Sequence, residues 1–185
     1  MFYTIDIAGL KRDLPLCPLN DKLYIGAFVM FGDVELTEHS AKELLALAPE
    51  HDVLLTAESK GIPLCYEMCR QSGKNRYVLA RKSVKLYMKE VVKCETQSIT
   101  TSARQTLYID GEDAEYMKGK RVLIVDDVVS TGGSLLSLEN LVNTVGGTIV
   151  GKMAVLAEGD AQKRDDIIYL AKLPLFDNCG NPIAD

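Results

Sequence analysis

The segment RVLIVDDVVSTGGS, residues 121–134, constrains the fold of this chain more than any other stretch. A short apolar run ends in two adjacent aspartates, and a turn of small residues then leads into a segment whose apolar residues recur at helical spacing. Apolar runs of this length, bounded by turn residues, are typical of strands buried on both faces in a parallel sheet. The segment therefore predicts a strand, a loop and a helix over residues 133–145.

Short apolar segments and helical segments alternate along the rest of the chain. Strands are predicted within residues 22–33, 52–58, 76–80, 106–110 and 148–158. Helices are predicted over residues 38–48, with Thr37 as the N-cap, and over residues 62–73. Residues 82–105 have no clear period and are expected to form a mobile loop, and residues 111–120 a polar connection. The alternation predicts an α/β fold with a mostly parallel central sheet flanked by helices.

Composition narrows the class of protein. The chain has 185 residues, a net charge of −5 and 47% hydrophobic residues, which fits one globular domain over residues 1–185. The acidic balance disfavours nucleic acid as a partner. No apolar run is long enough for a membrane helix, and no signal peptide is evident, so we expect a cytoplasmic protein without membrane contact. The five cysteines and two histidines show no metal-ligand spacing, and Cys65 and Cys69 are expected in the core.

The two aspartates and the turn after them suggest two halves of one ligand site. In parallel α/β sheets, ligands bind beyond the carboxyl ends of the strands, where Asp126 and Asp127 are expected. The STGGS turn places hydroxyls and flexible backbone before a helix N-terminus, which is an arrangement that binds anions. Carboxylates repel phosphate and instead suit sugar hydroxyls, a cation or a developing positive charge. A sugar phosphate satisfies both halves.

VLIVDDVVSTGGS resembles the phosphoribosyl-pyrophosphate (PRPP) loop of type I phosphoribosyltransferases. Neither GxxxxGK[ST] nor GxGxxG occurs, which disfavours a P-loop nucleotidase and a dinucleotide site. The resemblance implies the type I phosphoribosyltransferase fold, with a small hood formed by about the first 35 residues. It also implies that Asp126 and Asp127 are catalytic and hold the ribose hydroxyls, and that Val128 and Val129 form an apolar wall for the base. The residues implied for the 5′-phosphate are Ser130, Thr131, Gly132, Gly133 and Ser134.

A second anion site is predicted after the strand at residues 52–58. LLTAESKGIPL, residues 54–64, resembles the pyrophosphate loop of purine enzymes in this family. By position, Ser59 and Lys60 are implied to bind pyrophosphate, and Gly61 to allow its close approach.

Basic residues at the end of the next strand extend this second site. VLARKSVK resembles the strand end of adenine enzymes, in which Arg81 and Lys82 are implied to contact pyrophosphate, with Lys85 beside them or directed to a neighbouring subunit. Between residues 70 and 93, eight Lys or Arg stand against one Glu. This reversal of the overall charge suits a substrate with several phosphates.

The lid and the hood are less clearly encoded. CETQSITTSARQTLYI, residues 94–109, occupies the place of the family's catalytic lid but lacks the Tyr-Gly-Thr element and the following Glu of adenine enzymes. Glu95 is the candidate catalytic residue there, and Phe28 is the candidate in the hood for stacking on the base.

The resemblance implies a purine phosphoribosyltransferase that transfers the phosphoribosyl group of PRPP to a base and releases pyrophosphate. Adenine is the first choice of base, and hypoxanthine, guanine or xanthine the alternative, since both Lys152 and Glu158 are near a strand end. A PRPP-sensing transcriptional regulator and an orotate enzyme are weaker alternatives. Magnesium is implied as the cofactor, bound through PRPP with no direct protein ligand assigned, and a homodimer is expected.

Overall fold

A five-stranded parallel sheet forms the centre of the protein in the computed structural model, which describes residues 1–97 and 104–183. The strand order is β10-β9-β8-β4-β5, and neighbouring strands pair in parallel. The strands are β4 (Val53–Ala57), β5 (Val78–Ala80), β8 (Arg121–Val129), β9 (Thr148–Glu158) and β10 (Ile168–Leu173). The predicted α/β fold with a parallel sheet is therefore confirmed.

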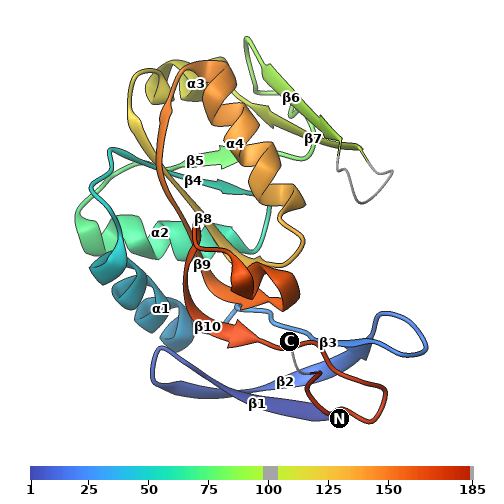
Figure 1. The fold of residues 1–185 in the computed structure, drawn as a ribbon. Helices are drawn as coiled ribbons and strands as arrows, with labels where there is room; N and C mark the ends of the chain where they lie inside the picture. The colour runs from blue at the N-terminus through green and yellow to red at the C-terminus, as the bar shows by residue number, and fades with distance from the viewer. Residues whose placement is uncertain (98–103, 184–185) are drawn as a thin grey trace.

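Helices cover both faces of this sheet (Figure 1). One face packs on α1 (Val34–Leu47) and α2 (Gly61–Ser72), and the other on α3 (Gly111–Met117) and α4 (Gly133–Val145). Alternate residues of β4 serve the two faces, since Leu54 packs with the α1 and α2 side and Leu55 with the α4 side. Burial of each such leucine contributes about 1.5–3 kcal/mol. All five residues of β4 are buried, and Thr56 is the one polar residue among them, because neither face of this strand meets water.

The hood is an antiparallel sheet of β1 (Phe2–Ile7), β2 (Leu10–Pro18) and β3 (Tyr24–Gly26). The C-terminal segment also belongs to it, because the backbone of Phe176 pairs with that of Tyr24 through bonds of 2.8 and 2.9 Å. Both chain ends therefore lie at the hood in Figure 1. The sequence predicted only the N-terminal contribution. A 3-10 turn, η1 (Gly159–Lys163), links β9 to β10.

The first helix begins earlier than predicted. Asp33, and not Thr37, is the N-cap of α1, and its carboxylate accepts a hydrogen bond from the Leu36 amide at 3.0 Å. Thr37 lies within the helix, where its hydroxyl donates to the Asp33 carbonyl at 2.7 Å. Both residue types cap helices well, and no local pattern distinguishes Asp33 from Thr37 as the cap.

Two predicted connections contain regular structure. Residues 82–105 were expected to form a loop, but they contain β6 (Val92–Gln97). This strand pairs in an antiparallel hairpin with β7 (Arg104–Ile109), which confirms the strand predicted within residues 106–110. Residues 98–103 lie outside the described part of the chain. Residues 111–120 were expected to be a polar connection, but they contain α3, capped by Asp110 and anchored by buried Ala114 and Met117. Two apolar anchors are too few to give a helical period in sequence.

Cys65 and Cys69 lie on the buried face of α2, in the core, as predicted. Among the described residues, no group of three or more His, Cys, Asp or Glu side chains is placed to hold a metal ion. Of the helices described, none is both long and apolar enough to cross a membrane.

Candidate active site

The strand order of the sheet reverses between β4 and β8. From β4 the chain passes through α2 to β5 on one side, and from β8 it passes through α4 to β9 on the other. Such a switch point leaves a crevice at the carboxyl ends of the two strands, which is where α/β proteins bind their ligands. The two anion loops predicted from sequence follow β4 and β8, so the fold brings them together at this crevice.

A lysine of the first loop contacts the acidic pair, Asp126 and Asp127, at the end of β8. Lys60 Nζ lies 2.7 Å from Asp127 Oδ2 and also donates to the Phe28 carbonyl at 3.3 Å. The Asp127 amide donates to Asp126 Oδ1 at 2.9 Å, which orients the Asp126 carboxylate. The Asp127 side chain is buried, whereas that of Lys60 is 41% exposed, so the ion pair lies at the edge between protein and water.

Burial, followed by the negative charge of Asp127, raises the pKa of the Asp126 carboxyl. Two adjacent carboxylates in a poorly solvated site are costly to ionise together, because each charge disfavours the other. Positive charge in the crevice therefore stabilises the ionised pair. This is the electrostatic setting that a cationic transition state needs.

The phosphate loop, residues 130–134, joins β8 to α4. Gly132 is the N-cap of α4 with φ of +78°, a conformation that favours glycine, and it provides no capping side chain. Amides at the start of a helix without such a cap are suited to bind an anion. A small cavity of about 50 Å3 lies here, lined by Asp126 and residues 128–135. The predicted cradle and Asp126 of the acidic pair therefore border one space.

A basic cluster, Arg81, Lys82 and Lys85, surrounds Glu58 at the ends of β4 and β5. Arg81 Nη1 lies 2.7 Å from Glu58 Oε1, the Lys82 amide donates to Oε2 at 2.9 Å, and Lys85 Nζ is 3.9 Å from Oε1. The Lys82 amide foremost, and Arg81 after it, lower the pKa of the Glu58 carboxyl. Sequence reasoning predicted the three cations but gave no role to Glu58, which gathers them.

Ser59 and Gly61, which were also predicted for the pyrophosphate site, follow β4. The Glu58–Ser59 peptide bond is cis. Gly61 opens α2, and a Cβ atom there would lie 2.1 Å from the Thr56 hydroxyl, so only glycine fits. The backbone of the predicted loop is therefore packed tightly against the strand.

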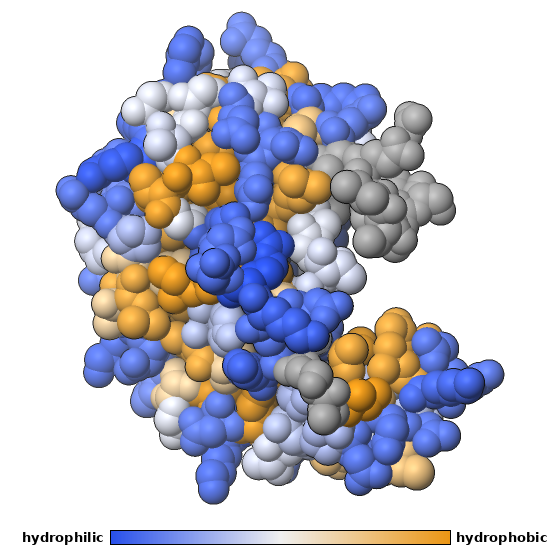
Figure 2. Space-filling model, viewed as in Figure 1, coloured by the Kyte–Doolittle hydropathy of each residue, from blue (hydrophilic) through white to orange (hydrophobic). Residues whose placement is uncertain are grey.

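A larger hollow of about 720 Å3 separates the hood from the phosphate loop. Figure 2 shows a notch on the right of the molecule, with apolar side chains on its hood side. The lining residues are Leu19, Leu23, Ile25, Ser130, Thr131, Glu158, Gly159, Asp160, Ala161, Arg164 and Leu175. This hollow is next to the phosphate loop and can hold a flat heterocycle between apolar hood residues and polar groups.

The residues predicted to contact the base lie in different surroundings. Val128 is partly exposed and borders the small cavity, whereas the side chain of Val129 is buried in the core on the α4 side. Phe28 is 4% exposed and packs in the core on the α1 and α2 side, so its ring has no face open to a ligand. Leu23 and Ile25 line the hollow instead, a placement the sequence did not indicate because the hood strands showed no clear pattern.

Glu95 lies on β6 and pairs with Lys93. The hairpin that carries it is joined to the basic cluster, because the backbones of Tyr108 and Arg81 exchange hydrogen bonds of 2.7 and 2.8 Å. The predicted lid thus starts beside the crevice. Its residues 98–103 are outside the described residues, and the catalytic role of Glu95 stays a prediction.

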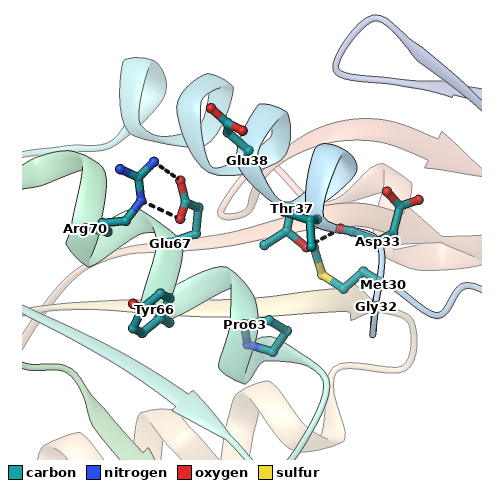
Figure 3. Close-up of a pocket in the computed structure, with 10 residues that line it drawn as sticks. Met30, Gly32, Asp33, Thr37, Glu38, Pro63, Tyr66, Glu67 and Arg70 are labelled. Atoms are coloured by element: carbon teal, nitrogen blue, oxygen red, sulfur yellow. Dashed lines mark hydrogen bonds and ion pairs between the residues drawn. The ribbon is translucent and has the colours of Figure 1, made fainter.

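A third cavity, of about 340 Å3, lies between α1 and α2 (Figure 3). Its lining includes Asp33, Tyr66 and the ion pair of Glu67 with Arg70, whose nearest N and O atoms are 2.7 Å apart. No residue predicted for the active site lines it, so this groove is separate from the crevice.

The fold and the site together define an α/β protein in which two candidate anion-binding loops meet at one switch point. A family model described as phosphoribosyl transferase domain matches residues 35–175, and the chain belongs to this family.

Named relatives fall in two groups. An adenine phosphoribosyltransferase of Thermotoga maritima is 30% identical over 158 residues, which are 84% of this chain and 87% of the relative. A hypoxanthine/guanine phosphoribosyltransferase of Methanosarcina mazei is 35% identical over 109 residues, or 59% of this chain. The matched region is only 53% of that archaeal relative's length.

Solved structures share the fold. The crystal structure of adenine phosphoribosyltransferase from Thermoanaerobacter pseudethanolicus aligns with a TM-score of 0.70 at 22% identity, covering 86% of this chain and 95% of that one. At this identity the likeness shows the fold alone, and it confirms the predicted type I phosphoribosyltransferase architecture.

Proposed function

We propose that this protein is a purine phosphoribosyltransferase of nucleotide salvage, which transfers the 5-phosphoribosyl group of PRPP to a purine base and releases pyrophosphate. The observation that carries the proposal is the placement of the acidic pair between two anion-binding regions at one crevice. A simple sugar phosphate needs only one such region. PRPP carries a phosphate at one end of the ribose and a pyrophosphate at the other, so it requires both.

Different residues bind different groups of PRPP. The phosphate loop holds the 5′-phosphate through amides and hydroxyls, and Asp126 and Asp127 accept hydrogen bonds from the ribose hydroxyls. The basic cluster, with Ser59 and Lys60, holds the pyrophosphate. Lys60 then exchanges part of its contact with Asp127 for the ligand, which leaves the acidic pair to face the ribose.

The reaction breaks the bond between C1 of the ribose and the pyrophosphate oxygen and forms a bond from C1 to a purine nitrogen, which loses its proton. Positive charge develops on the ribose ring in the transition state, and the acidic pair lies where it stabilises that charge. The basic cluster stabilises the negative charge on the departing pyrophosphate. Positioning and electrostatics therefore supply most of the rate, without a covalent intermediate.

Magnesium fits this site as an ion carried by the substrate. Proteins usually hold it through one or two carboxylates together with substrate phosphates, and the acidic pair provides such carboxylates beside the crevice. Bound magnesium neutralises charge on the pyrophosphate and makes it a better leaving group.

Adenine is the base that the hollow supports best. Its 6-amino group needs an acceptor, and Glu158 and Asp160 line the hollow. Burial raises the pKa of the Glu158 carboxyl, so forming a hydrogen bond there relieves an unfavourable environment. Lys152, the donor considered for a 6-oxo group, is instead paired with Asp166 and with Glu139, the latter at 3.0 Å. Hypoxanthine or guanine is the second candidate, because archaeal relatives are named for those bases.

We expect a homodimer in the cytoplasm. Val34 and Tyr66, which are 77% and 62% exposed, line the groove between α1 and α2 and are candidates for subunit contact. Size-exclusion chromatography with light scattering tests this expectation: a monomer at all concentrations contradicts it.

The activity is tested by incubating the protein with PRPP, magnesium and, in turn, adenine, hypoxanthine, guanine, xanthine or orotate, while pyrophosphate release is followed. We expect turnover with adenine, and less or none with the other bases. Reactions without a base measure hydrolysis of PRPP. Tight PRPP binding without turnover on any base contradicts the proposed enzyme.

A further inference from the structure

An arginine from outside the predicted motifs lies against the phosphate loop. Arg164 follows η1, and its Nη1 atom is 2.7 Å from the point where a Cβ atom of residue 132 would be. Gly132 therefore leaves room for the guanidinium as well as adopting a positive φ. Arg164 also lines the large hollow beside Ser130 and Thr131, so its side chain borders the surface of the loop that faces the ligand.

The phosphate loop has no positive side chain of its own. Of the described residues that line its small cavity, none is Lys or Arg, and Asp126 adds a negative charge. Amides and hydroxyls alone would have to hold a phosphate dianion beside the acidic pair. A guanidinium next to Gly132 supplies the missing charge and directional donors at the same place.

An ion-pair network holds the arginine there. Asp166 accepts hydrogen bonds from Arg164 Nε at 2.8 Å and from Nη2 at 2.7 Å, and it also pairs with Lys152 of β9. Lys152 in turn contacts Glu139 of α4 at 3.0 Å. The bonds to Asp166 use Nε and Nη2, whereas Nη1 is the atom directed at the loop. The network thus holds Nε and Nη2 of the guanidinium and leaves Nη1 directed at the phosphate loop.

We propose that Arg164 is a further ligand of the substrate's 5′-phosphate and that Asp166 positions it. The inference rests on the proposed function, because it takes the phosphate loop as the 5′-phosphate site. The competing explanation is that Arg164 only braces the loop. A brace would affect stability and every ligand alike, whereas a phosphate ligand affects only compounds that carry the 5′-phosphate.

Isothermal titration of the protein with ribose 5-phosphate and, separately, with pyrophosphate distinguishes the two roles. For Arg164→Gln we expect a loss of affinity for ribose 5-phosphate of about tenfold to a hundredfold, with pyrophosphate affinity unchanged, since a charge-assisted hydrogen bond is lost. Arg76→Gln is the matched control, because Arg76 pairs with Glu112 and Asp113 on α3, away from every proposed site. It should leave both affinities unchanged.

Each remaining outcome has one meaning. If Arg164→Gln binds ribose 5-phosphate as tightly as the unaltered protein does, the role of Arg164 is overturned and the proposed function is not. The same holds if Arg164→Gln loses affinity for both ligands equally. Failure of the unaltered protein to bind either ligand overturns the proposed function, and this inference with it. If Arg164→Gln does not fold, Arg164→Lys keeps the charge without the fork of donors. It should weaken ribose 5-phosphate binding by about threefold to tenfold and spare pyrophosphate, and unchanged binding contradicts the proposal.

Discussion

The phosphate loop and the basic cluster are both anion sites in the proposed reaction, yet they are built in different ways. The phosphate loop is one continuous segment between β8 and α4, and it offers an anion mainly backbone amides. The basic cluster is assembled from the ends of two strands around Glu58, and it offers an anion side-chain charge. The acidic pair lies at the end of β8, the strand that leads into the phosphate loop. Its Asp127 contacts Lys60, which is proposed to hold the pyrophosphate together with the basic cluster.

The two sites differ in positive side-chain charge because their ligand groups behave differently in the proposed reaction. The pyrophosphate must leave with its charge, so it meets cations that can stabilise it. The 5′-phosphate stays in place throughout, so it needs a rigid and specific cradle. Five variants test this division, taken from the largest expected effect to the smallest.

The double change Asp126→Asn with Asp127→Asn should have the largest effect. It removes the negative charge that stabilises the cationic ribose, so we expect kcat to fall about a hundredfold to a thousandfold. Pyrophosphate and ribose 5-phosphate should still bind, because neither anion site loses a donor. Circular dichroism verifies the fold. A double variant with near-normal turnover contradicts the role given to the acidic pair.

Arg81→Gln should act on the opposite side of the crevice. Loss of one charged donor to the pyrophosphate is expected to raise KM for PRPP by about tenfold to a hundredfold. Affinity for ribose 5-phosphate should not change, the reverse of the pattern expected for Arg164→Gln. Arg76→Gln is a matched control, because Arg76 pairs with Glu112 and Asp113 on α3. Equal weakening of both ligands by Arg81→Gln would abolish the distinction between the two sites.

Glu158→Gln lies outside both anion sites and should affect only the base. We expect KM for adenine to rise about tenfold, because the amide accepts the 6-amino group less strongly than the carboxylate. KM for PRPP should remain as in the unaltered protein. Glu139→Gln, which is outside the hollow, is the control. An unchanged KM for adenine would remove Glu158 from base recognition.

The smallest effect is on stability, and it should have opposite signs at the two sites. The pKa of Asp126 is raised to about 7, so the folded state binds its proton more tightly than the unfolded chain. This carboxyl therefore contributes stability at pH 4 that is lost as pH rises toward 7. We expect Asp126→Asn to raise Tm at pH 8 by about 2–8 °C, with little change at pH 4.

Glu58 gives the comparison. Its pKa is lowered in the folded state, so it contributes stability above its unfolded pKa that is lost as pH falls through the folded value. Glu58→Gln should therefore lower Tm at pH 8, and the difference should shrink in acid. Thermal unfolding followed at both pH values measures the two variants together. The same sign of change at pH 8 would contradict the electrostatic difference between the sites.

Sequence reasoning predicted the contiguous site better than the assembled one. The strand, acidic pair and phosphate loop could be predicted because every residue lies in one segment with a distinctive order. The cations Arg81 and Lys82 were predicted by resemblance, but Glu58 was not, because its partners follow a different strand. Arg164 was missed for the same reason. The elements α4, β9 and η1 separate it from the phosphate loop in sequence, but the two are adjacent in space.

The sequence by itself determined the elements and the local chemistry. Apolar runs and helical spacing specify β4, β8, α2 and α4, because burial on defined faces leaves a period in the chain. Tertiary structure alone decided which residues meet. Phe28 is in the core and Leu23 lines the hollow because the hood packs on α1 and α2 in one particular orientation. Lys60 meets Asp127, and Arg164 meets Gly132, because parallel strand ends converge at the switch point, and no local pattern encodes that convergence.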